Sequence, residues 1–384
     1  MAVRTVSLLG ATGSIGRQTL DVLRREPDHF ALESIAVSRS LDDAIAIVKE
    51  FRVARVGVAN AEDATRLARE LPGLDVVVGD AGLAELASAS DVCVNAVVGF
   101  AGLSATLSAL SNSRRLALAN KESLVAAAPL VDAVRRGRDT DLVPIDSEHC
   151  AIHQCLAGAH GESRGVSRLI LTASGGPFRT TSSNDLAHVT REQALSHPTW
   201  AMGPKITVDS STLMNKGLEV LEAAALFNYS VDQVDVVVHP QSIVHSMVEF
   251  VDGSTLAQLS HPDMRLPIAY CLGLPERLDH GWGRISFEEA MTLSFEPPRR
   301  DAFPALDLAY EAGRIGEAAP AWLSAANEVA VEAFLDGTIS WGDIVPVVRD
   351  ALAFYDRSAL RSVEELREHD ANARRRAREI MTSR

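Results

Sequence analysis

The first 25 residues carry the feature that most constrains the fold: an apolar strand pattern, a glycine-rich turn and an amphipathic helix pattern, in that order. Residues 3–9 form the apolar run, residues 10–16 read GATGSIG, and residues 17–25 have helical spacing. This order begins a dinucleotide-binding unit, in which a pyrophosphate lies against backbone N–H groups at the helix N-terminus. The spacing is G-x-x-G-x-x-G and not G-x-G-x-x-G, so a tight strand-to-helix turn without a ligand is the alternative.

Strand and helix patterns continue to alternate up to about residue 119. The further strand patterns lie at residues 32–37, 55–58, 75–78, 91–97 and 115–119, and the helix patterns at residues 41–51, 61–70, 82–88 and 101–111. Regular alternation of this kind is typical of a doubly wound parallel sheet with helices on its faces. The fold class predicted for this part is α/β, with a Rossmann-like sheet.

The second strand pattern ends in Ser38, Arg39 and Ser40. An enzyme that uses NADH would be expected to carry an acid here, for the ribose hydroxyl groups. A guanidinium group and hydroxyl groups fit a 2′-phosphate instead, which favours NADPH. The alternative is that Arg39 is an ordinary loop arginine in solvent.

Two stretches about seventy residues apart could together hold a cation and a phosphorylated substrate. In the first, Asp146 and Glu148 follow an apolar run and would point to the same side if the segment were extended. In the second, Asn215, Lys216 and Glu219 share one face of a predicted helix. Oxygen ligands suit a hard divalent cation. Solvated surface acids are the alternative for either stretch taken alone.

The strand pattern at residues 115–119 leads into Asn120, Lys121 and Glu122. This is the carboxyl end of a strand, where open α/β sheets bind ligands, although helix capping would explain the same residues.

The character of the chain changes after residue 146. A helix is predicted at residues 149–158 and a strand at 166–173, and an irregular stretch at about 178–206 is interpreted as a flexible flap that carries His197 and Trp200. Trp200 could close over a ligand or anchor its own loop. Strands at residues 234–238, 242–250 and 255–259 predict a second sheet, and four helices at 304–315, 320–336, 341–355 and 362–382 predict a C-terminal bundle. We therefore expect a central α+β catalytic domain between the N-terminal sheet and a C-terminal helical bundle.

Composition excludes several classes of protein. The net charge of −14 gives no support for nucleic acid as the main partner, and the cluster Arg374-Arg375-Arg376 lies among acids on one predicted helix. Four cysteines in 384 residues, without regular spacing, predict neither a disulfide framework nor a thiolate zinc cluster. The chain enters a strand pattern at once and has no apolar run of membrane-spanning length, so we expect a cytoplasmic protein with no membrane partner.

With these elements placed, the sequence resembles the 1-deoxy-D-xylulose 5-phosphate reductoisomerase family over nearly its whole length. The motifs that carry the resemblance are GATGSIG at residues 10–16, NKES at 120–123, DSEH at 146–149, LTASGGPF at 171–178, HPTW at 197–200 and DSSTLMNKGLE at 209–219. The resemblance implies an oxidoreductase and isomerase that uses NADPH and Mg²⁺ or Mn²⁺, binds a sugar phosphate and forms a homodimer. It implies four segments: an NADPH-binding domain (1–146), a catalytic domain (147–275) with the flap, a connection (276–302) and a helical domain (303–384).

The resemblance also implies roles for individual residues. The metal ligands would be Asp146, Glu148 and Glu219. The residues at the substrate would be Lys121, Ser147, Ser174, His197, Trp200, Ser210, Asn215 and Lys216, together with the ligand Glu148. The residues at NADPH would be Thr12, Gly13, Ser14, Ile15, Ser38, Arg39, Ser40, Asn120, Glu122 and Gly203.

The sequence departs from the family pattern at three places. Cys150 stands where a small hydroxyl residue is expected, Ser38 to Ser40 replace a Gly-Lys-Asn type of loop, and Pro204 stands where a basic residue is common. An alternative function is an NADP-dependent semialdehyde-type dehydrogenase with Cys150 as the thiolate nucleophile, which would leave the three acids without a role. A nucleotide-sensing module that has lost catalysis is a second alternative, but it would be expected to have lost metal ligands.

Overall fold

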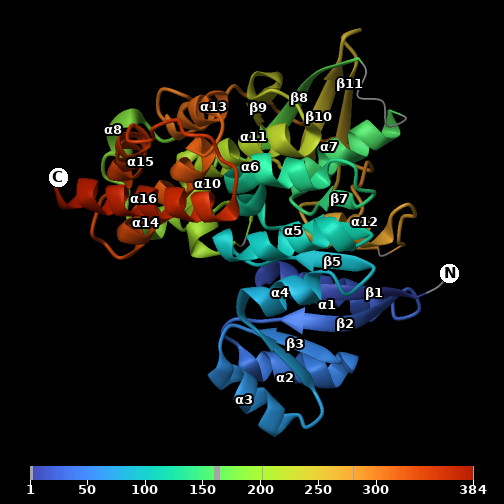
Figure 1. Ribbon diagram of the computed structural model, residues 1–384. Helices are drawn as coiled ribbons and strands as arrows, with labels where there is room; N and C mark the ends of the chain where they lie inside the picture. The colour runs from blue at the N-terminus through green and yellow to red at the C-terminus, as the bar shows by residue number, and fades with distance from the viewer. Residues whose placement is uncertain (1–2, 160–164, 201, 280, 384) are drawn as a thin grey trace. The chain divides into compact units, whose positions relative to one another are not determined.

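The computed structural model of the chain describes residues 3–159, 165–200, 202–279 and 281–383 (Figure 1). The chain divides into two compact units, and each is made of several segments. Unit 1 comprises Met1–Ser123, Val131–Cys150 and Asp263–Arg284, and unit 2 comprises Leu124–Leu130, Ala151–Pro262 and Ile285–Arg384. We describe each unit by itself.

Unit 1 is built on a seven-stranded sheet with the strand order β4-β3-β2-β1-β5-β6-β7. All neighbouring strands are parallel. The strands are β1 (Arg4–Leu9), β2 (Phe30–Ala36), β3 (Arg55–Val58), β4 (Asp75–Val78), β5 (Val92–Asn95), β6 (Arg115–Leu118) and β7 (Asp141–Pro144). The order of the strands reverses between β1 and β5, which is the position where open parallel sheets form their ligand crevice. The predicted Rossmann-like sheet is confirmed.

Helices connect the strands of unit 1, and up to residue 112 they follow the predicted alternation, whereas the helix at Lys121–Arg135 was not predicted. They are α1 (Ser14–Arg25), α2 (Leu41–Phe51), α3 (Ala61–Glu70), α4 (Gly79–Ala87), the short 3₁₀ helix η1 (Gly99–Gly102), α5 (Leu103–Asn112) and α6 (Lys121–Arg135), which runs on into unit 2. Helix α1 turns Leu20 and Leu23 into the core. Apolar burial of this kind stabilises the fold by roughly 1.5–3 kcal/mol for each large side chain.

A late segment of the chain also belongs to unit 1. Helix α12 (Arg265–Gly273) packs on α1, and its side chains join the same core cluster. Its C-terminal carbonyl groups accept hydrogen bonds from two arginines of the sheet: Arg115 Nη1 donates to Cys271 O (3.1 Å) and Leu274 O (2.9 Å), and Arg4 Nη1 donates to Leu274 O (2.9 Å). Cationic donors at a helix C-terminus satisfy carbonyl groups that the helix leaves without partners.

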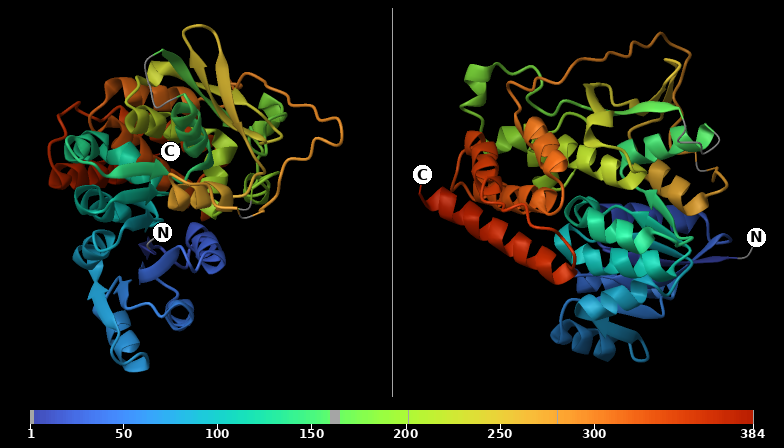
Figure 2. Two further views of the ribbon diagram at one scale, coloured as in Figure 1. Left: turned by 90° about the vertical axis from the view of Figure 1, so that its right-hand side faces the viewer. Right: turned by 45° about the horizontal axis from the view of Figure 1, so that its top comes forward.

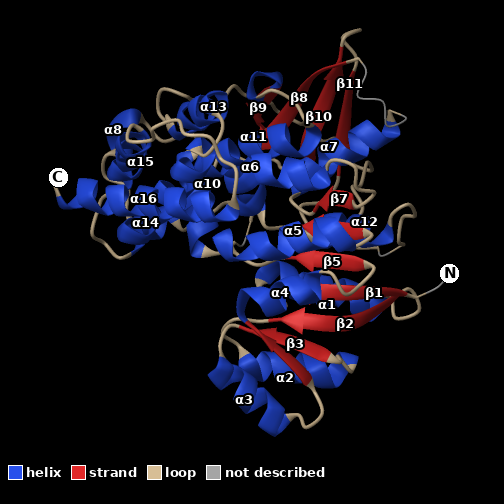
Figure 3. Cartoon of the chain, in the orientation of Figure 1, coloured by secondary structure: helices blue, strands red, loops and turns tan. Residues whose placement is uncertain are grey.

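Unit 2 contains a four-stranded sheet with the order β11-β10-β8-β9, whose strands can be followed in Figure 3. The strands are β8 (Val166–Ala173), β9 (Val234–Val238), β10 (Val244–Phe250) and β11 (Thr255–Leu259). Strands β8 and β9 are parallel, and β10 is antiparallel to both β8 and β11. Beyond β9, the connecting segment contributes one isolated bridge, in which Val238 and Glu296 exchange backbone hydrogen bonds.

The helices of unit 2 form two groups. The first surrounds the sheet and its loops and comprises the end of α7 (Ser147–Gly158), α8 (Ser183–Leu186), α9 (Arg191–Ala194), α10 (Pro204–Thr212), α11 (Met214–Phe227) and the 3₁₀ helix η2 (Val231–Gln233). The second is the predicted bundle of α13 (Ala305–Ile315), α14 (Ala319–Leu335), η3 (Trp341–Asp343), α15 (Ile344–Leu352) and α16 (Val363–Thr382). In that bundle α16 packs along α14 and α15 (Figure 2). In the described part of the chain, no helix has the length and apolar character needed to cross a membrane.

Candidate functional site

The glycine turn after β1 is shaped by backbone contacts that admit no side chain. Gly10 has φ +84°, and a Cβ atom there would lie 2.4 Å from Ala96 O. A Cβ atom on Gly16 would lie 2.3 Å from Gly10 O. Both positions therefore require glycine. Between them, Gly13 and Ser14 are exposed where α1 begins, so the backbone N–H groups of the first turn are open to an anion. Thr12 and Ile15, also predicted to contact the cofactor, flank them and are partly buried.

Strand β2 ends beside this turn, because Gly10 N and Ala11 N both donate to Ala36 O. Ser38 and Arg39 are exposed and follow β2 after one buried residue, Val37, and Ser40 precedes the first residue of α2. A guanidinium group at this edge of the sheet has the charge and the donor geometry to pair with a phosphate. The exposed position of Arg39 is compatible both with a contact to a 2′-phosphate and with the alternative of a loop arginine in solvent.

Asn120 has a capping role in unit 1. Its Oδ1 accepts from Ser123 N (3.0 Å) at the start of α6, and its Nδ2 donates to Val97 O (2.6 Å) and Gly99 O (2.8 Å). Its side chain is therefore used inside the protein, as the capping alternative anticipated. Glu122 is buried in the first turn of the same helix.

The first pair of acids lies at the start of a helix and not in an extended segment. The Asp146 carbonyl group accepts from Cys150 N (2.8 Å), so α7 begins at Ser147, directly after Asp146. The extended geometry on which the same-side placement of the two acids depended does not occur, because the helix predicted at residues 149–158 starts two residues earlier. Glu148 lies in the first turn, where the helix dipole favours a carboxylate, and accepts a hydrogen bond from Ser147 Oγ.

Asp146 is held ionised by its neighbours in unit 1. Lys121 Nζ lies 2.9 Å from Asp146 Oδ2, and His149 Nδ1 lies 3.5 Å from Asp146 Oδ1. Burial alone would raise the pKa of the Asp146 carboxyl group, but the charge of Lys121 and the contact with His149 hold that pKa well below its usual range. His149 stands three residues after Asp146 and has no role among the residues predicted from the sequence.

In unit 2, the stretch that carries Asn215, Lys216 and Glu219 is divided between two helices. Leu213 has φ +61° and separates α10 from α11, a break that the sequence analysis did not predict. Residues 215 and 216 therefore lie in the first turn of α11, where backbone N–H groups favour an anion. The shared face is confirmed, because Asn215 Nδ2 donates to Glu219 Oε1 (2.5 Å) and Lys216 Nζ contacts Glu219 Oε2. The Glu219 carboxylate, which is 1% exposed, is thus oriented by donors from its own helix.

A glycine turn follows β8 and touches α10. Gly176 has φ +67°, and a Cβ atom there would lie 2.6 Å from Ser210 O. Ser174 Oγ accepts a hydrogen bond from Gly176 N (3.2 Å) and lies 3.0 Å from His197 Nε2. The structure therefore brings Ser174 and Ser210, which the family resemblance places at the substrate, onto adjoining segments.

His197 organises the stretch around it. Its Nδ1 accepts hydrogen bonds from the backbone N–H groups of Thr199 (3.2 Å) and Trp200 (2.9 Å). Burial lowers the pKa of the imidazole, so the neutral form is favoured. The Trp200 ring is partly buried, with its centroid 6.4 Å from that of His245 on β10, which agrees with the loop-anchoring alternative.

The predicted flap at about residues 178–206 is more ordered in secondary structure than expected. It contains α8 and α9, each one turn long, and α10 already begins at Pro204. Ser182 and Thr190 cap the two short helices through hydrogen bonds from Asp185 N and Gln193 N, which is the capping signal that the prediction overlooked. Gly203 is exposed at the N-cap of α10, and Ala201 lies outside the described residues.

The thiol alternative finds no support in the environment of the cysteines. All four are buried, and Cys150 is 1% exposed. Burial raises the pKa of Cys93 to about 12 and that of Cys155 to about 11. Reactive thiolates need a partly exposed, electropositive setting, which a buried thiol lacks.

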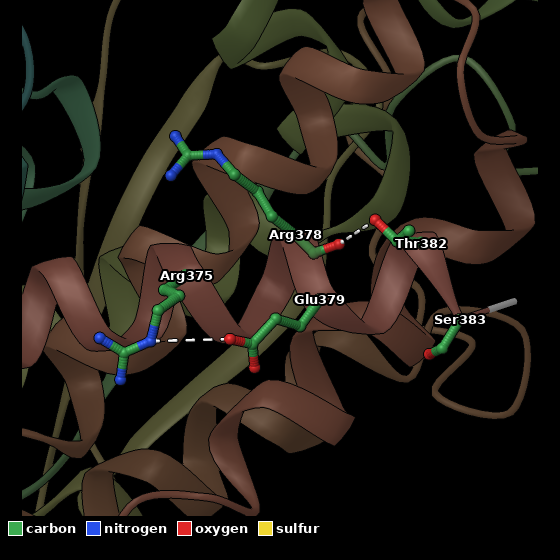
Figure 4. Close-up of a pocket in the computed structure, with 5 residues that line it drawn as sticks. All are labelled: Arg375, Arg378, Glu379, Thr382 and Ser383. Carbon is green, nitrogen blue, oxygen red and sulfur yellow. Dashed lines mark hydrogen bonds and ion pairs between the residues drawn. The ribbon is translucent and has the colours of Figure 1, made fainter.

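The arginine cluster near the C-terminus is bordered by acids. Figure 4 shows a pocket on one face of α16, where Arg375 Nε lies 3.7 Å from Glu379 Oε1. Arg374 pairs with Glu328 and with Asp370 (2.7 Å). None of the predicted site residues lines this pocket.

Three family models match the chain. They describe 1-deoxy-D-xylulose 5-phosphate reductoisomerase (residues 6–128), its C-terminal domain (residues 142–227) and the DXP reductoisomerase C-terminal domain (residues 259–376). The chain is 48% identical to the 1-deoxy-D-xylulose 5-phosphate reductoisomerase of Heliobacterium modesticaldum, over 98% of this chain and 97% of that protein. It is 45% identical to the enzyme of the same name from Chlorobaculum tepidum, over 99% of this chain and 100% of that protein.

Solved structures give the same result. The reductoisomerase of Zymomonas mobilis in complex with NADPH matches with a TM-score of 0.93 and 42% identity, over 100% of both chains. A reductoisomerase in complex with NADPH, fosmidomycin and magnesium matches with a TM-score of 0.92 and 38% identity, over 99% of this chain and 98% of that one. Neither alternative function is favoured by these relatives. The chain belongs to the 1-deoxy-D-xylulose 5-phosphate reductoisomerase family.

Proposed function

We propose that this protein converts 1-deoxy-D-xylulose 5-phosphate into 2-C-methyl-D-erythritol 4-phosphate, a step of isoprenoid precursor synthesis, with NADPH as the reductant and Mg²⁺ or Mn²⁺ as the metal. Family membership over the full length supports the activity. The observation that carries the proposal is the first turn of α11, where Asn215 and Lys216 orient the buried carboxylate of Glu219 beside the N-terminus of a helix. That turn offers oxygen for a cation and N–H donors for an anion.

NADPH is assigned to unit 1. Thr12, Gly13, Ser14 and Ile15 would line its pyrophosphate, with the N–H groups of Ser14 and Ile15 as donors because Gly13 N already donates to Gly10 O (3.0 Å). Ser38, Arg39 and Ser40 would hold its 2′-phosphate. Asn120 and Glu122 of unit 1 and Gly203 of unit 2 are the further residues proposed to contact NADPH. When bound, NADPH supplies the hydride that reduces the rearranged aldehyde.

The donor set fits a hard divalent cation. All three proposed ligands are carboxylates and therefore offer oxygen atoms, which a hard divalent cation prefers. Asp146 is ionised, Glu148 follows it in the first turn of α7, and Glu219 is buried. When bound, Mg²⁺ or Mn²⁺ stabilises the negative charge that develops on substrate oxygen during the rearrangement.

The substrate contacts follow from the donors of unit 2 and two residues of unit 1. Ser174 Oγ accepts from Gly176 N–H and from His197 Nε2–H, so its own hydroxyl hydrogen remains available for a phosphate oxygen. Ser210, Asn215 and Lys216 add donors at the break between α10 and α11. Lys121 and Ser147 would line the reacting carbon chain. His197 and Trp200, on the proposed flap, would exclude water from the bound substrate.

The functional division proposed from the sequence assigns residues 1–146 to NADPH and residues 147–275 to metal and substrate, with a connection at 276–302 and helical support from 303–384. A cytoplasmic location agrees with the consumption of NADPH. A homodimer is also proposed, on the family resemblance of the sequence. Sedimentation of the protein as a monomer at micromolar concentration would contradict the dimer.

The activity is tested by following NADPH oxidation with 1-deoxy-D-xylulose 5-phosphate, with EDTA and then with added Mn²⁺. Wild-type protein should show metal-dependent turnover, and Glu219→Gln should lose it. Glu249→Gln is the matched control, because Glu249 is an acid of unit 2 that pairs with Arg168. If neither EDTA nor Glu219→Gln changed the rate of turnover, the metal-dependent function would be contradicted. The alternative of a simple dehydrogenase that uses Cys150 would then be favoured.

A further inference from the structure

One side chain of the C-terminal bundle contacts both segments that carry the proposed phosphate ligands. Trp341 Nε1, in η3, donates a hydrogen bond to Ser211 Oγ (2.8 Å), next to Ser210. The Trp341 ring lies edge-on to Phe178, with centroids 5.5 Å apart and planes at 79°. Phe178 ends the turn that begins at Ser174. The indole of Trp341 therefore contacts both α10, through Ser211, and the glycine turn, through Phe178.

A second contact from the bundle holds α10 on the other side of Ser210. Asn327 Nδ2, on α14, donates to Asp209 Oδ1 (2.8 Å), and Lys205 Nζ lies 2.8 Å from Asp209 Oδ2. Asp209 and Ser211 are each 1% exposed, and Asn327 is 0% exposed. Consecutive side chains of a helix are about 100° apart, so anchoring the residues on both sides of Ser210 fixes the backbone position and the Cα–Cβ direction of Ser210.

The anchors matter because the contact between the two segments is tight. The space beside Gly176 is occupied by Ser210 O, so a small rotation of α10 would change the distance between Ser174 and Ser210. Because Gly176 and Ser210 O are closely packed, a movement of α10 would displace the glycine turn as well.

We propose that Trp341 and Asn327 are positioning residues for substrate phosphate: the C-terminal bundle sets the spacing of Ser174 and Ser210 through the Trp341–Ser211 and Asn327–Asp209 hydrogen bonds. This inference rests on the proposed function. Neither residue touches the substrate, and both act through their hydrogen-bond partners on α10.

The test compares two Trp→Phe variants of the full-length protein. Trp341→Phe removes the donor to Ser211 and keeps an aromatic ring beside Phe178. Trp322→Phe is the control, because Trp322 also donates its indole N–H within the bundle, to His369 Nδ1 (3.1 Å), in a partly buried hydrogen bond. We expect Trp341→Phe to raise the KM for 1-deoxy-D-xylulose 5-phosphate about fivefold, which corresponds to the loss of one hydrogen bond, with the KM for NADPH unchanged. Trp322→Phe should change neither.

The Asn327–Asp209 hydrogen bond allows a second, independent test, in which a double variant should restore the affinity that a single variant loses. Asn327→Asp places a second carboxylate against Asp209 and should raise the KM for the sugar phosphate at least tenfold. The double variant Asp209→Asn with Asn327→Asp restores one donor and one acceptor, so it should recover most of the lost affinity. A general loss of structure would lower the active fraction and kcat, but it would not raise the KM for the sugar phosphate while leaving the KM for NADPH unchanged.

The outcomes separate the two claims. Wild-type protein that does not turn over the sugar phosphate would overturn the proposed function and the inference with it. An active wild type in which Trp341→Phe matches Trp322→Phe in both KM values, or in which the double variant shows no rescue, would overturn only the positioning role.

Discussion

The imidazole Nε2 of His197 lies 3.0 Å from the hydroxyl oxygen of Ser174, and the backbone determines which of the two atoms donates. Because Nδ1 already accepts two backbone N–H groups, a neutral His197 carries its hydrogen on Nε2. Ser174 Oγ is therefore the acceptor in this contact. Protonation of Nδ1 would remove both backbone bonds, so the turn at residues 197–200 depends on a neutral imidazole.

The stability of the protein should fall at mildly acidic pH because of His197. Burial lowers its pKa in the folded state, while the unfolded chain keeps the usual value of about 6.5. As the pH falls from about 6.5 through the lowered pKa, the unfolded chain takes up a proton that the folded chain does not, so the free energy of unfolding decreases. Above about 6.5 both states are neutral and the contribution is constant.

Urea denaturation of wild type and His197→Asn across this pH range measures the effect. Asparagine keeps an acceptor near the Nδ1 position and cannot titrate. The variant should therefore lose less stability than wild type between neutral and mildly acidic pH. Equal losses in the two proteins would assign the acid sensitivity to other groups.

Gly176→Ala should destabilise the protein more than a glycine substitution in open space. Gly176 has φ +67° and its Cβ position is blocked at 2.6 Å by Ser210 O, whereas Gly253, in the β10–β11 turn, has φ +84° and open space around it. Gly253→Ala should cost about 1 kcal/mol from backbone strain alone, and Gly176→Ala about 3 kcal/mol. Thermal unfolding of both variants tests this, and equal shifts in Tm would mean that the turn relaxes away from α10.

Local patterns were sufficient to predict most elements of the fold. The alternation up to residue 119 predicted the parallel sheet, because a strand or a core-facing helix can be recognised from its own apolar spacing. The turn before α1 could be predicted because glycine is required where backbone atoms leave no room for a Cβ atom. Asn215, Lys216 and Glu219 could be placed on one face because they lie within one helix.

Contacts between distant segments had no local signal. Nothing in residues 265–273 shows that α12 packs on α1, because its apolar side chains would suit any core. Leu213 is an ordinary helix former, yet it is left-handed and buried in the folded chain, where Met214 N–H donates to Thr212 Oγ1. The Trp341–Ser211 bond joins residues 130 positions apart, and only the folded chain reveals it.

Arg39 should determine the preference for NADPH. It is exposed just beyond β2, at the carboxyl edge of the sheet that carries the glycine turn. Arg39→Ala should raise the KM for NADPH about tenfold, because a charge-assisted contact with the 2′-phosphate is lost, and should leave the KM for NADH unchanged. Arg66→Ala is the control, since Arg66 is an exposed arginine of unit 1 that pairs with Glu70 at 2.8 Å. An Arg39→Ala protein that discriminates against NADH as strongly as wild type would show that other groups read the 2′-phosphate.

The carboxylate of Glu219 should determine metal affinity before any substrate is bound. It is 1% exposed and receives Asn215 Nδ2 at 2.5 Å on one oxygen and Lys216 on the other, so its orientation is set in advance. Glu219→Gln removes the negative charge and should weaken binding of Mn²⁺ to the substrate-free protein at least a hundredfold, whereas Asn215→Ala removes only an orienting donor and should weaken it about tenfold. Titration of Mn²⁺ by electron paramagnetic resonance measures both variants without relying on turnover, with Glu249→Gln as the control. If Asn215→Ala binds Mn²⁺ as wild type does while its KM for the sugar phosphate rises, Asn215 serves the phosphate alone and the orientation of Glu219 depends on Lys216.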